Sequence, residues 1–100
     1  MNRLEYLFNL VSEEGGEISQ AANKCARFTP HHAYYAESNL ERLQTEITDL
    51  VTILNMLSEE LKYEFDLKPC EAKRERVEKF MQISRDMGTL KDDNPVEKLP

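Results

Sequence analysis

Apolar residues recur along this chain at the three- and four-residue spacing of amphipathic α-helices, in three separate segments. The first segment predicts a helix over residues 2–27. The second predicts a helix to about residue 63, opened by Ser38 or Asn39 as a cap. A third helix is expected from Pro69 to a stop at Gly88. The pattern therefore predicts an all-α fold, a helical bundle of three to four helices.

The two longer segments differ in one informative position. The second carries an unbroken heptad seam, formed by Leu40, Leu43, Ile47, Leu50, Leu54, Leu57 and Leu61. The apolar stripe of the first is interrupted at Glu14, where a hydrophobic residue is expected. Because burying a lone carboxylate is costly, Glu14 requires a cationic partner, access to solvent or a bound metal ion. Glu46 and Asp49 flank the seam of the second helix, so we expect Glu14 to be the most deeply buried of the three.

Two glycines and a polar end modify this picture. Gly15 and Gly16 cross the first segment at a cost of about 1 kcal/mol each relative to Ala. They indicate either a break into two helices, or a kink or bare backbone that a neighbour or ligand approaches closely. Residues 28–38 read as a loop, and residues 89–100 as a polar C-terminal tail after a domain that spans 1–88.

Composition narrows the class of protein. With 100 residues the chain is long enough for one domain with a small core, and we expect homo-oligomerisation to complete that core. A net charge of −6 argues against binding to nucleic acid polymers or to an anionic membrane. Cys25 and Cys70 lack metal-finger or CxxC spacing, and the start of the chain does not resemble a signal peptide. We therefore expect a cytoplasmic protein.

Carboxylates three residues apart occur on both long helices. Glu14 precedes Glu17, and Glu46 precedes Asp49, so each pair shares one helix face. Like charges on adjacent turns destabilise a helix unless something positive lies between them. Four carboxylates without a histidine or cysteine partner are hard oxygen ligands, which suit Mg²⁺, or Mn²⁺ in its place.

The same residues form two motifs in order, Glu13-Glu14-Gly15-Gly16-Glu17 and Glu46-Ile47-Thr48-Asp49. This Glu-Glu-x-x-Glu and Glu-x-x-Asp arrangement resembles the MazG-like, all-α nucleoside triphosphate pyrophosphohydrolases. The resemblance covers about residues 4–88, including the stretch 73–88. Two features depart from the family pattern, a long segment between the motifs and the glycine pair inside the first of them.

The resemblance implies hydrolysis of a (deoxy)nucleoside triphosphate between the α and β phosphates, which yields a nucleoside monophosphate and pyrophosphate. The expected role is nucleotide-pool clean-up. It implies that Glu14, Glu17, Glu46 and Asp49 hold the Mg²⁺. Glu13, or a ligand carboxylate, is then the candidate general base, which makes Glu13, Glu14 and Glu17 the candidate catalytic residues.

Basic side chains are expected to complete the binding of the phosphates. Lys24 lies two turns after Glu17 and matches a position of the family, while Lys73 and Lys79 come from the third helix, with Arg27 and Arg74 behind them. For each of these a surface salt bridge is the alternative. Other candidates are weaker: His31 and His32 lack metal spacing, and the possible contacts to a base are Phe28, Tyr34, Tyr35, Asn39 and Asn55.

Two alternatives stay open. In the first, the chain is a non-catalytic helical oligomerisation module with an acidic face, which accounts for the leucine seam but not for Glu14 on the apolar stripe. In the second, within the enzyme class, the chain is a phosphoribosyl-ATP pyrophosphohydrolase, which has a similar helical scaffold. A di-iron carboxylate bundle is set aside because neither long helix carries a Glu-x-x-His motif.

Overall fold

The computed structural model describes residues 1–33 and 37–91. It contains three α-helices, α1 (Arg3–Phe28), α2 (Asn39–Leu61) and α3 (Glu71–Asp86), and no strand among these residues. The prediction of an all-α fold is confirmed. The chain divides into two compact units, Met1–Phe65 and Asp66–Pro100, which are described separately.

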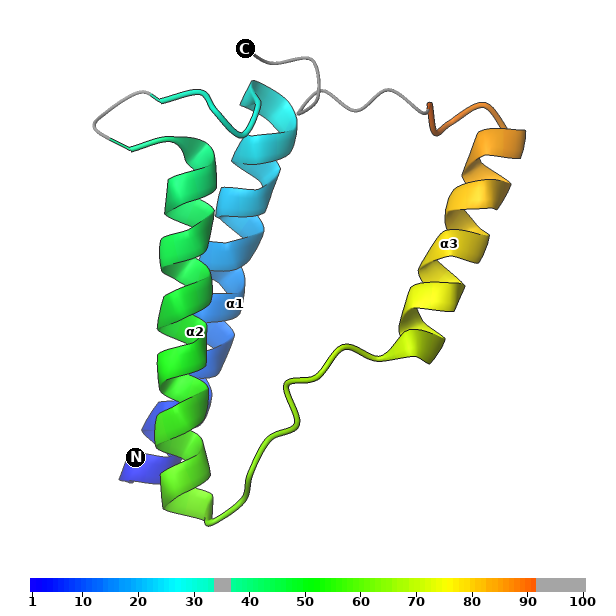
Figure 1. Ribbon diagram of the computed structural model, residues 1–100. Coiled ribbons are helices and arrows are strands. Elements are labelled where there is room, and N and C mark those ends of the chain that lie inside the picture. Colours follow the sequence, from blue (N-terminus) through cyan, green and yellow to red (C-terminus); the bar gives the residue numbers. More distant parts are fainter. Residues whose placement is uncertain (34–36, 92–100) are drawn as a thin grey trace. The chain divides into compact units, whose positions relative to one another are not determined.

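The first unit is a hairpin of two long helices, α1 and α2, that run antiparallel and pack side by side (Figure 1). Both helices begin where the sequence provides a cap. Asn2 Oδ1 accepts a hydrogen bond from the Glu5 amide at 2.8 Å. Ser38 and Glu41 form a capping box, with both hydrogen bonds 3.1 Å long. These side chains bond polar groups at the helix ends that would otherwise lack intrahelical partners.

Helix α1 continues without interruption through Gly15 and Gly16, so of the two alternatives for these glycines the break into two helices is wrong. Packing against α2 stabilises α1 at these glycines, where the intrinsic helix propensity is poor. Both glycines are exposed, and a Cβ built on either would meet no atom of the described residues within 4 Å. Nothing in the described part of the chain therefore requires glycine at these two positions.

We expect Gly15→Ala and Gly16→Ala each to stabilise the protein by about 0.5–1 kcal/mol, because alanine is the better helix former and has space. Thermal or urea unfolding measures the gain. Gly88→Ala is the control: Gly88 has a φ of 78°, where alanine is strained, so no gain is expected there. A loss at position 15 or 16 would instead indicate that another molecule approaches this backbone closely.

The apolar interior of the hairpin is small. Among the described residues three apolar side chains are fully buried, Leu7, Ala21 and Leu57, at 2%, 4% and 2% exposed. The heptad seam of α2 is only partly covered, since Leu40 and Ile47 remain 46% and 41% exposed. One neighbouring helix covers only part of an apolar stripe as wide as this one.

The burial of Glu46 corrects a prediction. Its side chain faces the hairpin interior and the residue is 4% exposed, whereas its seam neighbour Ile47 is largely open. Glu46 therefore lies within the interior and not beside it, and the prediction that Glu14 is the most buried carboxylate is wrong. The physical reason is that a buried charge is tolerated when it is paired, and Glu46 has a partner in Arg42.

In the second unit, α3 begins at Glu71 after Cys70, two residues later than predicted. It ends at Asp86, and Gly88 adopts the left-handed conformation expected of a helix stop. Its apolar residues are exposed or half-buried in this unit. Of the predicted tail, residues 92–100 lie outside the described part of the chain. Within the described part, none of the helices has the length and apolar character needed to cross a membrane.

Candidate metal centre

Three carboxylates from two helices meet midway along the hairpin. Glu14 comes from α1, and Glu46 and Asp49 come from successive turns of α2. One oxygen from each lies within 4.8 Å of the others. The antiparallel packing thus brings together three of the four ligands that the motifs predict.

Glu14 differs from Asp49 and Glu46 in having a buried carboxylate oxygen with no partner among the described residues. The side chain is partly buried, and its Oε2 atom is buried without a hydrogen-bond partner among the described residues. Burial raises the pKa of the Glu14 carboxyl above its ordinary 4.5, and the charges of Asp49 and Glu46 raise it further, followed by those of Glu13 and Glu17. A folded protein rarely leaves a buried carboxylate oxygen without a partner, and Oε2 is the atom of Glu14 that a bound cation would satisfy.

Glu46 is the deepest carboxylate and is held by a cation. Arg42 Nη2 lies 2.9 Å from Glu46 Oε1, one helical turn away, and Arg42 Nη1 lies 3.5 Å from Glu37 Oε1. The predictions from sequence did not include Arg42, although its spacing of four residues from Glu46 is that of an ion pair along a helix. The Arg42 guanidinium thus pairs with one of the three clustered carboxylates, so negative charge remains in excess in the cluster.

The donor set fits a small divalent cation. All candidate donors are carboxylate oxygens, which Mg²⁺ and Mn²⁺ prefer. Oxygens on opposite sides of an octahedral Mg²⁺ are about 4.2 Å apart, since each lies at about 2.1 Å from the ion. The three carboxylate oxygens lie within 4.8 Å of one another, so small movements of the side chains would bring them within reach of one ion.

The raised pKa of Glu14 predicts a specific pH dependence. Between pH 4.5 and the folded pKa, the folded protein binds more protons at Glu14 than the unfolded chain, so the free energy of unfolding falls as pH rises. In EDTA we therefore expect Glu14→Gln to be more stable than wild type at pH 8. The difference should shrink as pH is lowered and vanish below about pH 4.5. Thermal melting of both proteins from pH 8 to 4 measures it, and a pH-independent difference would contradict the assignment.

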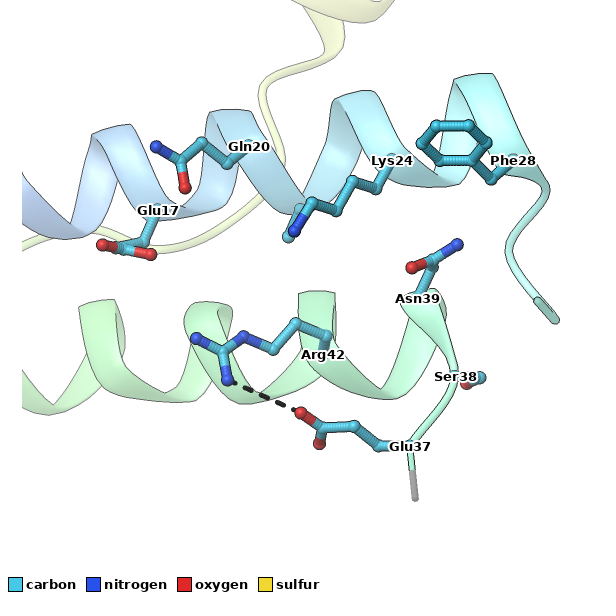
Figure 2. A pocket seen from close by; sticks show the side chains of 9 residues that line it. Glu17, Gln20, Lys24, Phe28, Glu37, Ser38, Asn39 and Arg42 are labelled. Atoms are coloured by element: carbon cyan, nitrogen blue, oxygen red, sulfur yellow. Dashed lines mark ion pairs between the residues drawn. The ribbon is translucent and has the colours of Figure 1, made fainter. Parts of the chain in front are cut away.

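A pocket of about 290 Å³ adjoins the carboxylates, between the end of α1 and the start of α2 (Figure 2). Two predicted site residues line it, Glu17 and Lys24. Glu17 is therefore one turn from the three clustered carboxylates but outside their group. The side chains of Lys24 and Arg42 both extend into the space between the helices (Figure 2). Its complete lining is Glu17, Gln20, Ala21, Lys24, Phe28, Glu37, Ser38, Asn39 and Arg42.

The other predicted residues are placed as follows. Glu13 is exposed beside Glu14 and outside the cluster of three. Lys73 and Lys79 are exposed on α3, in the second unit, and their contact with phosphate stays a prediction. Of the candidates for base contact, Phe28 and Asn39 line the pocket and Asn55 does not, while Tyr34 and Tyr35 lie outside the described residues. His31 and His32 are exposed. Arg74 forms an ion pair with Glu71 at 3.7 Å.

Comparisons of this chain with models of known protein families, with curated proteins and with solved structures gave no significant match.

Proposed function

We propose that this chain is a Mg²⁺-dependent nucleoside triphosphate pyrophosphohydrolase, with its metal centre at Glu14, Glu46 and Asp49. The observation that carries the proposal is the buried, unpartnered Oε2 of Glu14 facing two further carboxylates from the neighbouring helix. An acidic patch on a solvated surface would not bury such an atom. The order of the two acidic motifs, and their resemblance to the MazG-like enzymes, point to the same chemistry.

The proposed reaction assigns a role to each carboxylate. Glu14, Glu46 and Asp49 hold Mg²⁺, and Glu17 joins them from the edge of the pocket. A Mg²⁺ ion held by these residues would neutralise the charge of the polyphosphate and would polarise the phosphorus. Glu13 is exposed and close to Glu14, so it is placed to accept a proton from the attacking water as general base.

Cationic side chains are expected to contact the phosphates. Lys24 lines the pocket and makes no ion pair with any described residue, so its charge is available to an anion. Arg42 lies between the pocket and the metal centre through its contact with Glu46. Its planar guanidinium suits bidentate contact with phosphate oxygens. Lys73 and Lys79 are proposed as further contacts.

The proposal is tested by incubating the protein with a panel of nucleoside triphosphates and Mg²⁺ and measuring the release of pyrophosphate. We expect a nucleoside monophosphate and pyrophosphate, and no orthophosphate, from at least one member of the panel. EDTA should abolish the reaction. No turnover of any triphosphate, by a folded protein in Mg²⁺ or Mn²⁺, would refute the enzyme proposal.

A non-catalytic self-associating module is the second candidate, and the exposed apolar residues of α2 favour it. Leu40, Ile47 and Val51 are 41–46% exposed, while the buried apolar interior is small. We propose that a second copy of the chain covers this face, as a homodimer or homotetramer, whether or not the protein is an enzyme. Because association stabilises only folded protein, the melting temperature should rise with protein concentration. Sedimentation gives the oligomer size, and the assay above separates the two candidates.

A further inference from the structure

We propose that the pocket between the end of α1 and the start of α2 binds the nucleoside of the substrate, and that Asn39 selects bases that carry an exocyclic amino group. The inference rests on the proposed pyrophosphohydrolase function. The metal centre would hold the phosphates of the substrate, and this pocket would hold its nucleoside and select among bases.

The side chains that line the pocket differ in chemical character from one end of the pocket to the other. Glu17 and Arg42 line the pocket three and four residues from Glu14 and Glu46, or about 4.5 and 6 Å along the helix axes. Phe28 lines the other end of the pocket, 14 residues from Glu14 and about 21 Å along α1. The charged side chains of Glu17 and Arg42 thus lie toward the carboxylates, and Phe28 and Asn39 add an aromatic ring and an amide at the far end (Figure 2). Glu37 also comes from the far end, but its charge is paired with Arg42.

A nucleotide has the same order of groups along its length, with charged phosphates at one end and an aromatic base at the other. If the metal centre holds the phosphates, the base extends toward Phe28. Aromatic rings bind bases by stacking without requiring a particular base. The volume of about 290 Å³ is at the lower limit for small-molecule sites, which suits one base and part of its sugar.

The backbone at the start of α2 does not provide an alternative phosphate site. The Asn39 amide donates to His32 O at 2.9 Å, and the Leu40 amide donates to Pro30 O at 2.8 Å. The Glu41 amide donates to Ser38 Oγ at 3.1 Å. With these amides already bonded, a helix N-terminus of the usual anion-binding kind is not available, which leaves the phosphates to the metal centre and the cationic side chains.

The side-chain amide of Asn39 has a defined orientation. Asn39 Nδ2 donates a hydrogen bond of 3.0 Å to Thr29 O. A carbonyl oxygen only accepts, so the amide nitrogen must lie on that side and Oδ1 on the other. Oδ1 accepts no hydrogen bond from any described residue, and Figure 2 shows it directed toward Lys24 and Arg42 across the pocket.

An acceptor held in this orientation favours a donor on the base. Cytosine and adenine present an exocyclic amine where uracil and hypoxanthine present a carbonyl oxygen. A site that aligns a fixed acceptor with a carbonyl leaves two acceptors facing each other, and such mismatches discriminate strongly. Asn55, the other candidate for base contact, lies 16 residues along α2 and does not line the pocket.

The test uses ligands that differ at this one group. Calorimetry measures the binding of the α,β-imido analogues of CTP and UTP to the protein in the presence of Mg²⁺. These analogues resist cleavage between the α and β phosphorus atoms. Inorganic tripolyphosphate serves as the ligand without a nucleoside. We expect the CTP analogue to bind about tenfold more tightly than the UTP analogue. Asn39→Ala should remove this difference, and Phe28→Leu should weaken both analogues about tenfold with little effect on tripolyphosphate. Asn55→Ala is the matched control and should match wild type.

Two further variants and readouts separate the possible failures. Phe28→Tyr keeps an aromatic ring and should restore binding, and circular dichroism checks the helix content of every variant. If Mg²⁺ raises the melting temperature but the three ligands bind equally and Phe28→Leu changes nothing, the pocket assignment is overturned and the metal centre stands. If Mg²⁺ has no effect but analogue binding depends on Phe28 and Asn39, the pocket assignment stands and the proposed function falls.

Discussion

Replacing Glu14 by glutamine is expected to reduce pyrophosphate release by about a hundredfold or more and to abolish the rise in melting temperature caused by Mg²⁺. The amide keeps the size and one acceptor oxygen of the carboxylate, but it removes the charge that faces Glu46 and Asp49. A metal ion stabilises developing charge by several kcal/mol, and each 1.36 kcal/mol corresponds to tenfold in rate. Steady-state kinetics and thermal melting with and without Mg²⁺ measure both effects.

The same variant should be no less stable than wild type when EDTA is present at neutral pH. Glu14 is costly in the folded protein because it is partly buried among like charges. A residue that lowers stability and raises activity is the expected signature of a functional site. Asp49→Asn should also lose activity and the Mg²⁺ response, because Asp49 belongs to the same cluster.

Glu59→Gln is the matched control, because it removes one carboxylate from an exposed position of α2 remote from the cluster. It should leave activity and the Mg²⁺ response within about twofold of wild type. Equal losses from Glu14→Gln and Glu59→Gln would indicate a general effect of net charge. A Glu14→Gln variant that is less stable than wild type in EDTA, with unchanged activity, would make Glu14 a structural residue.

The helices of this chain could be predicted because their signals are local. The spacing of apolar residues, the cap at Ser38 and the stop at Gly88 each depend on a few neighbouring positions, and each marks its helix or helix end within two residues. A break at Gly15 and Gly16 was one alternative that helix propensity alone suggested, but packing against α2 outweighs about 2 kcal/mol of poor propensity.

The sequence indicated which carboxylates would lie close together better than it indicated how deeply each is buried. Motif spacing selected Glu14, Glu17, Glu46 and Asp49, and the hairpin brings all but Glu17 into one cluster. A hydrophobic pattern assigns a carboxylate to the surface, so it placed Glu46 beside the interior. Burial of Glu46 depends on its ion pair with Arg42, and pairing of this kind is decided by tertiary contacts. The pocket lining at Asn39 likewise depends on how the loop returns the chain to α2.

Leu57→Ala is expected to be the most destabilising single substitution among the apolar residues of α2. Leu57 is 2% exposed and is one of three fully buried apolar side chains among the described residues. Truncating a buried leucine costs about 2–5 kcal/mol, out of a total stability of roughly 5–15 kcal/mol for a domain. The melting temperature should fall by more than about 10 °C.

Leu40→Ala on the same helix is the control, since Leu40 is 46% exposed within a single chain. At a protein concentration low enough to separate the copies of the chain, its truncation should cost less than about 1 kcal/mol. Leu57 lies 11 residues beyond Glu46, about 16 Å along α2, so its loss should leave the carboxylate cluster in place. Mg²⁺ should therefore still raise the melting temperature of Leu57→Ala, because a ligand that binds only the folded protein stabilises it whatever the starting stability. If Leu40→Ala instead costs as much as Leu57→Ala, the exposed face of α2 is buried in solution, and the folded unit is an oligomer whose second core lies between copies of the chain.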